Sequence, residues 1–373
     1  MVVGINRSTQ LNVNLNYLQH NVQEFKNFSG KKVWAVVKAD GYGCGILEVS
    51  RACLQAGAEG LCVAILDEAI FLREKGLNCP ILVLGITDVE EYELARKYNI
   101  SITVGDVQSL RDYSEKNNID NINQPLHVHI ACDTGMNRIG FKNVVEINKA
   151  IEFITNSNLF DFEGIFTHFA TADEINNEYF KLQNNDWKHV LKSIIKKPKY
   201  IHCANTATTL WHKDDVLGNS VRIGIGLYGL NPSNGVKSLP IELKPVASLT
   251  SNLIFVKKLS TGMKVSYGAT YELKNDDWIG TLPIGYADGY PRSMQGFKVL
   301  INGKFCEIVG RVCMDQLMIK LPNKLKVGTK VTLIGKEENK EITFEDVAKY
   351  LNTINYEILV DIGNRVKRTY IFK

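Results

Sequence analysis

At 373 residues the chain is too long for one small domain, so two domains are expected. A hydrophobic content of 45% with 23% charged residues is typical of a globular protein with a sizeable core. The net charge of +4 and the lack of a long basic run argue against nucleic-acid binding, and no run of about 18 apolar residues predicts a membrane span.

The first two-thirds of the chain alternate short β-rich runs with segments of helical periodicity. Helices are predicted at 46–54 and at 88–95, the second with Asp88 as its N-cap. Eight strands with intervening helices over about 200 residues predict a (β/α)8 TIM-type barrel. The predicted strands are 33–37, 61–65, 80–84, 100–104, 126–131, 162–167, 200–203 and 220–225.

An open doubly wound sheet is the alternative architecture. The glycines after the first strand are Gly41, Gly43 and Gly45, with no glycine at the sixth position of the motif. The second strand also lacks a closing acidic residue. The signal for a dinucleotide-binding sheet is therefore weak.

Helical patterning fades near residue 240, and β-rich segments follow at 253–256, 278–282, 297–301 and 330–334. Asn302-Gly303 between two apolar runs predicts a type I′ hairpin. We therefore expect a barrel domain at 10–240 and a mainly β domain at 241–373. Residues 1–9 are expected to pack with the second domain.

The cysteine pattern predicts free thiols. Eight cysteines are present, without a Cys-x-x-Cys pair or a metal-ligand spacing, so no metal site is expected. The N-terminus lacks the long apolar core of a signal peptide. These features favour a soluble domain in a reducing compartment such as the cytoplasm, including a soluble part of a longer membrane-anchored protein.

Charged and polar residues follow the predicted barrel strands, where barrels of this type carry their active sites. Lys38 follows the first strand, Arg138 lies in the loop after the fifth, and His168 ends the sixth. Thr206 follows the seventh strand, and Arg222 lies on the eighth. His168 alone would more often be a core histidine, but a chance gathering of all five residues at one rim is improbable.

Lys38 is the residue with the most specific chemistry. A lysine at the end of an apolar strand is desolvated, which favours the neutral amine that Schiff-base chemistry with a carbonyl or with pyridoxal phosphate requires. The alternative is a lysine that reaches solvent from the strand end.

Strands seven and eight of such barrels commonly form a phosphate site. Thr206 supplies a hydroxyl, and Gly224 and Gly226 let backbone N–H groups approach an anion, although a tight turn would also use these glycines. A phosphate site opposite Lys38 points to pyridoxal phosphate.

The chain resembles the alanine racemase family, the fold-type III pyridoxal phosphate enzymes, from about Asn6 to Arg368. The matching motifs are Val-Val-Lys38-Ala-Asp-Gly-Tyr-Gly, Asp133-Thr-Gly-Met-Asn-Arg138, Thr167-His168-Phe-Ala-Thr-Ala-Asp173, Arg222-Ile-Gly-Ile, Val265-Ser-Tyr267-Gly-Ala-Thr-Tyr, Gly285-Tyr286-Ala-Asp-Gly-Tyr-Pro-Arg292 and Gly310-Arg311-Val-Cys-Met314-Asp315.

The resemblance implies that Lys38 carries pyridoxal 5′-phosphate and acts as one base. Tyr267 of the partner subunit is then the opposite base, because racemisation needs a base on each face of a planar carbanion. Cationic neighbours, expected to be His168 and Arg222, would favour its phenolate. Arg222 matches the residue that faces the pyridine nitrogen. Since arginine stays charged, it leaves that nitrogen unprotonated, which favours racemisation over transamination.

Further roles follow from the same resemblance. The family implies a head-to-tail homodimer whose two active sites are shared across the interface. Arg138 and the backbone N–H of Met314 of the partner subunit match the groups that hold the substrate carboxylate. The phosphate ligands match Tyr42, Thr206, Gly224 and Ile225, and the entrance corridor matches Tyr286, Asp173, Arg292 and Arg311.

Two positions depart from the family pattern. Ala131 stands where the family often has a lysine, carbamylated in some members, so another group, such as a chloride ion or a water, must orient Arg138. Asn364 stands where a tyrosine touches the phosphate and narrows the site. The smaller, polar Asn364 is expected to contact cofactor and substrate and to make room for a hydroxylated amino acid.

The Asn364 change resembles the serine/alanine racemases of vancomycin resistance, whose racemase domain is attached to a membrane domain. We therefore predict a racemase of serine that also accepts alanine and supplies D-amino acid for peptidoglycan precursors. The first alternative is an ordinary alanine racemase. Less favoured are a non-catalytic pyridoxal phosphate-binding protein, which would lack the second domain, and a Schiff-base aldolase that uses no pyridoxal phosphate.

Overall fold

The computed structural model describes residues 3–116 and 124–372. The chain divides into two compact units. One unit, here called the barrel unit, comprises Leu18–Gly41 and Ile46–Lys244. The other, here called the β unit, comprises Met1–Tyr17, Tyr42–Gly45 and Pro245–Lys373.

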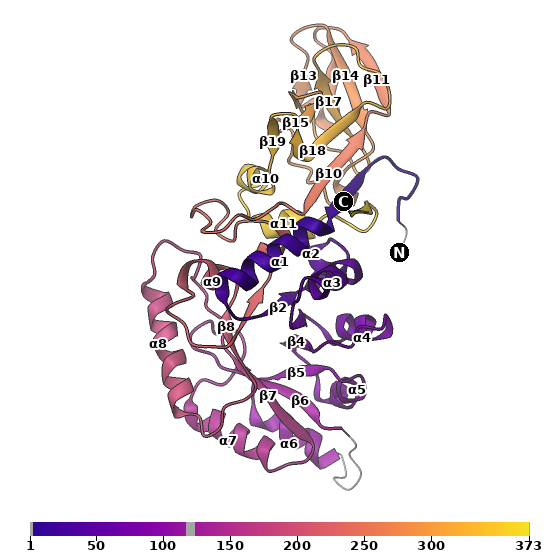
Figure 1. The fold of residues 1–373 in the computed structure, drawn as a ribbon. Helices are drawn as coiled ribbons and strands as arrows, with labels where there is room; N and C mark the ends of the chain where they lie inside the picture. Colours follow the sequence, from indigo (N-terminus) through magenta and orange to yellow (C-terminus); the bar gives the residue numbers. More distant parts are fainter. Residues whose placement is uncertain (1–2, 117–123, 373) are drawn as a thin grey trace. The chain divides into compact units, whose positions relative to one another are not determined.

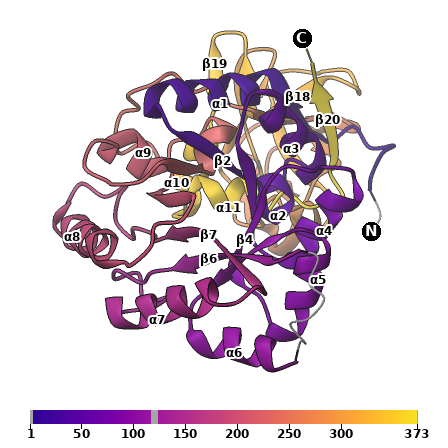
Figure 2. The same ribbon diagram turned by 60° about the horizontal axis from the view of Figure 1, so that its bottom comes forward.

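Eight parallel strands close into a barrel in the barrel unit (Figure 2). Because β2 pairs with β9 as well as with β3, the sheet has no free edge, and the predicted (β/α)8 barrel is confirmed over the open sheet. All eight predicted runs overlap these strands. They are β2 (Lys32–Val36), β3 (Gly60–Val63), β4 (Ile81–Ile86), β5 (Ser101–Val104), β6 (Leu126–Ala131), β7 (Phe160–Phe166), β8 (Tyr200–Ala204) and β9 (Ser220–Ile223).

Helices surround the barrel strands, as Figure 2 shows for α3 to α9. Their apolar faces cover the strands, and residues such as Ile102 and Ile165 are fully buried between the layers. The helical segments are α1 (Leu15–Ser29), α2 (Lys38–Tyr42), α3 (Ile46–Gln55), α4 (Leu66–Glu74), η1 (Val89–Glu91), α5 (Tyr92–Lys97), α6 (Val107–Lys116), α7 (Val144–Thr155), α8 (Glu178–Ser193), α9 (Thr206–His212) and η3 (Ile225–Tyr228).

The segment predicted as one helix at 88–95 begins differently. It starts with the 3-10 turn η1, and α5 follows. Asp88 has extended backbone geometry, but its side chain makes no capping hydrogen bond. Its carbonyl instead accepts from the Glu91 N–H at 2.9 Å, the i to i+3 bond that closes a 3-10 turn. Asp88 is therefore the N-cap residue by position, as predicted, but its side chain does not make the capping hydrogen bond.

The β unit contains three sheets, and in Figure 1 the paired strands β10, β18 and β15 lie side by side. The largest sheet has the order β16-β15-β18-β10-β1-β20, with β19 paired to β18. The strands are β1 (Gln10–Asn14), β10 (Ala247–Asn252), β11 (Phe255–Leu259), β12 (Lys264–Val265), β13 (Tyr271–Glu272), β14 (Asp277–Leu282), β15 (Lys298–Ile301), β16 (Lys304–Glu307), β17 (Leu317–Leu321), β18 (Lys330–Glu337), β19 (Lys340–Ile342) and β20 (Lys367–Ile371).

Short helical segments connect these strands. They are η4 (Tyr267–Ala269), η5 (Tyr286–Asp288), α10 (Phe344–Leu351) and α11 (Asn355–Val360). The hairpin between β15 and β16 is confirmed, because Asn302 and Gly303 both have positive φ, 47° and 68°, as a type I′ turn requires. The strand predicted at 253–256 is displaced, since β11 begins at Phe255.

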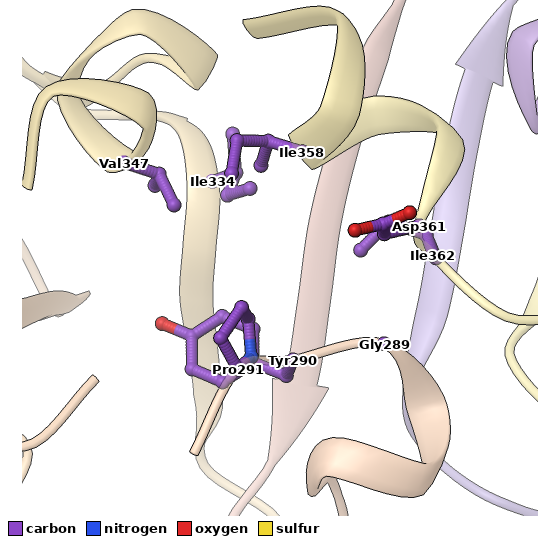
Figure 3. A pocket seen from close by; sticks show the side chains of 8 residues that line it. All are labelled: Gly289, Tyr290, Pro291, Ile334, Val347, Ile358, Asp361 and Ile362. Atoms are coloured by element: carbon purple, nitrogen blue, oxygen red, sulfur yellow. The ribbon is translucent and has the colours of Figure 1, made fainter. Parts of the chain in front are cut away.

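Figure 3 shows a small hollow inside the β unit. It has room for about one water molecule. Its lining is mostly apolar, with Ile334, Val347 and Ile358 across from Tyr290 and Pro291. None of the predicted site residues belongs to this lining, so the hollow is a gap in the packing of the unit. Within the described residues, no helix combines the length and apolarity that a membrane crossing needs.

Candidate active site

Lys38 lies at the start of an unusual left-handed turn. It follows β2 by two residues, and Ala39, Asp40, Gly41 and Tyr42 after it all have φ between 52° and 62°. The Gly41 N–H donates to the Val37 carbonyl at 2.8 Å. Left-handed conformation costs a residue with a side chain roughly 1–2 kcal/mol, so the surroundings must hold such a turn in place.

Glu68 on α4 supplies part of that support. Its carboxylate accepts from the Asp40 N–H at 3.3 Å and from the Ala64 N–H at 2.8 Å. Asp40 in turn accepts from the Ile46 N–H at 2.9 Å. These bonds join the turn to the end of β3 and to the start of α3. Lys38 is the side chain that this turn presents after β2.

The environment of Lys38 favours its neutral amine. Burial lowers the pKa of the Lys38 ammonium, and the positive charge of Arg138 lowers it further, against an opposing effect of Glu68. This direction agrees with the desolvated lysine that the sequence predicted. It suits an amine that must act as a nucleophile and as a base.

Arg222 and His168 are brought together at the barrel rim. Arg222 on β9 is 3% exposed, and it donates to the Thr167 carbonyl at 2.8 Å and to His168 Nδ1 at 3.2 Å. Burial and the positive charge of Arg222 lower the pKa of His168 to about 3, so the imidazole is neutral. This corrects the expectation that His168 adds positive charge beside a phenolate.

Thr206 lies against the glycine-containing segment that follows β9. Thr206 Oγ1 accepts from the Gly224 N–H at 3.0 Å, and the Gly226 N–H lies 3.5 Å away. A Cβ at Gly226 would lie 2.7 Å from Thr206 Cγ2 and 2.5 Å from the Phe25 ring, so only glycine fits there. The Gly224 N–H is therefore engaged within the protein, whereas the Thr206 hydroxyl hydrogen is free to donate to a phosphate.

Arg138 lies in the loop after β6, which Asp133 shapes by accepting from the Gly135 and Asn137 N–H groups at 3.1 and 2.9 Å. The charge of Arg138 lowers the pKa of both Lys38 and His168, which places it near the other rim residues. Ala131 is buried at the end of β6 and carries no group that could orient Arg138.

These barrel-unit residues fit pyridoxal phosphate. Lys38 provides a desolvated amine just after β2, and Arg222 provides a buried cation on the neighbouring strand β9. Thr206 follows β8, which also pairs with β9, so its hydroxyl lies on the same side of the barrel. Pyridoxal phosphate carries an aldehyde, a pyridine ring and a phosphate. Lys38 would bind the aldehyde, Arg222 would face the ring, and Thr206 would bind the phosphate. Asp173 also belongs to the barrel unit.

The other predicted site residues belong to the β unit. Tyr267 is 66% exposed, at a turn where Ser266 has a φ of 65° and donates to the Arg311 carbonyl. Tyr286 and Met314 are also exposed apolar side chains. The remaining ones are Tyr42, Arg292, Arg311 and Asn364.

A buried carboxylate joins three segments of the β unit. Asp288 is fully buried and accepts from Arg7 at 2.7 and 2.8 Å, and it lies 3.0 Å from Arg365 Nε. Its carbonyl accepts from the Gly363 N–H at 2.9 Å. Asp288 thereby fixes the turn of Tyr286 beside the loop of Asn364.

Sequence reasoning missed the hydrogen-bonded carboxylates Glu68, Glu163 and Asp288. Two of them left a signal in the sequence. Glu68 lies five residues after a buried strand, and Glu163 interrupts the apolar run of the sixth strand. A carboxylate in such a position must have hydrogen-bond donors around it, because an unpaired buried charge is costly.

Comparison with known proteins identifies the family. The alanine racemase N-terminal domain matches residues 13–232, and the alanine racemase C-terminal domain matches residues 246–370. The alanine racemase of Pediococcus pentosaceus is 50% identical over 372 residues, which cover 99% of this chain and 98% of that protein. That of Lactiplantibacillus plantarum is 50% identical over 374 residues and the full length of both chains.

Solved structures agree. The alanine racemase from E. faecalis has a TM-score of 0.97 at 47% identity and covers 100% of both chains. A histidine racemase from Leuconostoc mesenteroides subsp. sake has a TM-score of 0.94 at 34% identity, over 99% of this chain and 100% of that one. The two matched domains together span most of the sequence, and the chain belongs to the alanine racemase family.

Proposed function

We propose that this protein interconverts L- and D-alanine and so supplies D-alanine for peptidoglycan precursors. The observation that carries this proposal is the Lys38 turn, which presents a desolvated amine beside the buried Arg222 cation at one rim of a closed barrel. The alanine racemases that are about half identical over their whole length support alanine as the substrate.

Pyridoxal 5′-phosphate is the cofactor of this family. When bound, it supplies an aldehyde and an electron sink that acidifies the Cα hydrogen of an amino acid. We propose that Lys38 holds it, that Tyr42, Thr206 and Ile225 bind its phosphate, and that Gly224 shapes the backbone there. The Gly224 N–H acts indirectly, because it donates to the Thr206 hydroxyl that faces the anion.

The proton transfers fall to two side chains. Lys38 takes or returns the Cα proton on one face, which its lowered pKa favours because more of the amine is neutral. Tyr267 of the partner subunit serves the other face in a head-to-tail homodimer. Arg138 and the N–H of the partner subunit's Met314 hold the substrate carboxylate, and Tyr286, Asp173, Arg292 and Arg311 line the entrance.

Arg222 decides which reaction follows proton removal. Its guanidinium has only donor groups, so it can face the pyridine nitrogen without protonating it. His168 holds the guanidinium through Nδ1 and, because its own pKa is lowered to about 3, adds no charge. By leaving the ring nitrogen unprotonated, Arg222 would weaken the electron sink and so favour immediate return of the proton over transamination.

Serine is the second candidate substrate, and one residue favours it. Asn364 is exposed in the loop after α11, beside the Arg365 that contacts Asp288. The histidine racemase among the similar structures demonstrates that this fold accepts more than one amino acid. The full-length relatives are alanine racemases, and they give no support to the predicted link with vancomycin resistance or with a membrane domain.

A side-by-side racemisation assay with L-alanine, L-serine and L-histidine tests the proposal. We expect kcat/KM to be highest for alanine. A value that is higher for serine would replace alanine by the second candidate. A protein that binds pyridoxal phosphate but racemises none of the three would be a carrier. A protein that shows no absorbance from bound pyridoxal phosphate would instead be the Schiff-base aldolase.

Replacing Asn364 by tyrosine tests the residue itself. Tyrosine fills space that a hydroxymethyl side chain would need, so N364Y should lower the serine-to-alanine ratio of kcat/KM by about tenfold, as one misplaced group in a binding pocket does. The matched control is N352A, which changes a surface asparagine at the end of α10. An unchanged ratio in N364Y would remove Asn364 from the specificity argument.

A further inference from the structure

A row of buried polar side chains crosses the interior of the barrel from Arg222 to Glu163. Arg222 Nη1 lies 2.7 Å from His202 Nδ1, and His202 Nε2 lies 2.8 Å from His129 Nδ1. His129 Nε2 lies 3.0 Å from Glu163 Oε2, which also accepts from Ser101 at 2.5 Å. We call Arg222, His202, His129 and Glu163 the barrel relay.

The donors and acceptors of the relay permit one arrangement of hydrogens. A guanidinium can only donate, so His202 Nδ1 accepts and its hydrogen lies on Nε2. His202 Nε2–H then donates to His129 Nδ1, and His129 Nε2–H donates to the Glu163 carboxylate. Both rings are therefore neutral and have the same tautomer, a state that the donor at the Arg222 end and the acceptor at the Glu163 end hold together.

The pKa directions of His202 and Glu163 agree with this arrangement. Burial and the nearby Arg222 charge lower the pKa of His202 well below its ordinary value, so this ring stays neutral. Burial raises the pKa of Glu163, but its interactions with His129, led by the hydrogen bond, and the hydrogen bond from Ser101 outweigh that effect and lower it to about 2. The row thus has a cation at one end, an anion at the other, and two neutral rings between them.

Both rings are closely packed. His202 stacks on Phe166 at 5.1 Å between ring centroids, and Trp34 lies edge-on to His129 at 5.9 Å. A Cβ at Gly164 would lie 2.2 Å from His129 Nδ1, so glycine next to Glu163 is what admits the ring. The relay is a built feature of the core, and the alanine racemase chemistry described above does not use Glu163 or His129.

We propose that Glu163 is a positioning residue for Arg222, and that it acts through His129 and His202 by fixing the tautomer that lets His202 accept from the guanidinium. Glu163 is needed because Arg222 must keep one orientation while it remains charged and buried. The importance of that orientation for the cofactor ring rests on the proposed function. The hydrogen-bond relay itself does not.

Removing the hydrogen-bond acceptor at position 163 should therefore change the hydrogen bond between Arg222 and His202. In E163L, which has a similar volume, His129 Nε2–H loses its acceptor and becomes an unpaired buried donor, a cost that favours the ring form with its hydrogen on Nδ1. His129 would then donate to His202 Nε2, which moves the His202 hydrogen to Nδ1 and breaks the bond from Arg222. In E163Q the amide oxygen still accepts, so the original arrangement is retained.

Neutron diffraction or 15N NMR of the histidine rings tests this directly. In the wild-type protein both rings should be neutral with hydrogen on Nε2. E163Q should keep this pattern, and E163L should move the His202 hydrogen to Nδ1. A wild-type imidazolium at either ring, or hydrogen on Nδ1 of either ring, would overturn the proposal. This arm is informative even if E163L does not fold or if the protein proves not to be a racemase.

Kinetics of the cofactor-loaded enzyme give the second readout. We expect E163L to lower kcat for alanine by about tenfold with little change in KM, because the substrate carboxylate is held elsewhere. E163Q should keep most of the wild-type kcat. The control T332V breaks a buried hydroxyl–carboxylate bond in the β unit and should leave kcat unchanged. A folded E163L with the wild-type kcat and His202 tautomer would refute the positioning role.

Discussion

His127 couples the stability of the barrel to pH. At the start of β6 its Nδ1 lies 2.8 Å from Asp161 Oδ2, and its side chain is 26% exposed. The hydrogen bond to Asp161 raises the pKa of His127 although burial opposes it. The folded state therefore binds the proton more tightly than the unfolded chain, whose histidines titrate near pH 6.5.

The sign of the effect follows from that difference. Stabilisation by the His127–Asp161 pair is fully present below about pH 6.5 and is lost as the pH rises through the folded pKa. We expect H127Q to lower the free energy of unfolding at about pH 5.5 and to have little effect at about pH 8.5. Urea unfolding of both proteins at the two pH values measures this, and a pH-independent difference would mean that the charge is irrelevant.

At the scale of single residues, the sequence predicted the positions of several site residues but not the charge state of His168. Lys38, Arg222 and His168 could be found because each ends or interrupts an apolar strand, and the barrel brings those ends together. The neutral state of His168 could not be found, because it depends on the burial that only the folded barrel creates. Asn364 predicted serine from one position, and whole-chain similarity favours alanine instead.

At the scale of elements, the left-handed turn after β2 depends on α4. Glu68 accepts the Asp40 and Ala64 N–H groups and so holds the turn that presents Lys38. E68A leaves both donors without their acceptor, and we expect it to lower the free energy of unfolding by about 1–3 kcal/mol. The affinity for pyridoxal phosphate should fall as well, because the amine is no longer held in position.

The control for that prediction is E48A on α3, which removes a surface pair with Arg51 worth about 0–1 kcal/mol. Fluorescence titration with pyridoxal phosphate and urea unfolding measure the two quantities. If E68A behaves like E48A in both, Glu68 does not support the turn.

The elements themselves were largely predictable, for a physical reason. Strands buried on both sides read as short apolar runs, and the eight runs of the barrel stand out between amphipathic helices. Element starts were harder. The 3-10 turn after Asp88 satisfies its carbonyl with a backbone bond that no side-chain pattern reveals. The left-handed turn after β2 was also hidden, since three of its four residues are not glycine.

At the scale of the whole molecule, the proposed homodimer makes a quantitative prediction. Lys38 belongs to the barrel unit, and the exposed Tyr267 belongs to the β unit. If each site combines Lys38 of one protomer with Tyr267 of the partner subunit, K38A and Y267F are each inactive but complement one another. A mixed dimer then has one intact site and one doubly altered site.

Equal amounts of the two variants, unfolded and refolded together, should regain about a quarter of the wild-type activity, since half of the dimers are mixed and each has one working site. Wild-type protein carried through the same refolding gives the reference value. No activity above the sum of the separate variants would argue that both bases come from one protomer.

The most direct test of the central claim is exchange of the Cα hydrogen in D2O. The purified protein, loaded with pyridoxal phosphate, is incubated with L-alanine, and both enantiomers are analysed by mass spectrometry. We predict that deuterium appears at Cα of D-alanine and L-alanine as they interconvert, and that K38A abolishes the exchange. A protein that binds pyridoxal phosphate through Lys38 yet leaves the Cα hydrogen of alanine, serine and histidine unexchanged would contradict the account.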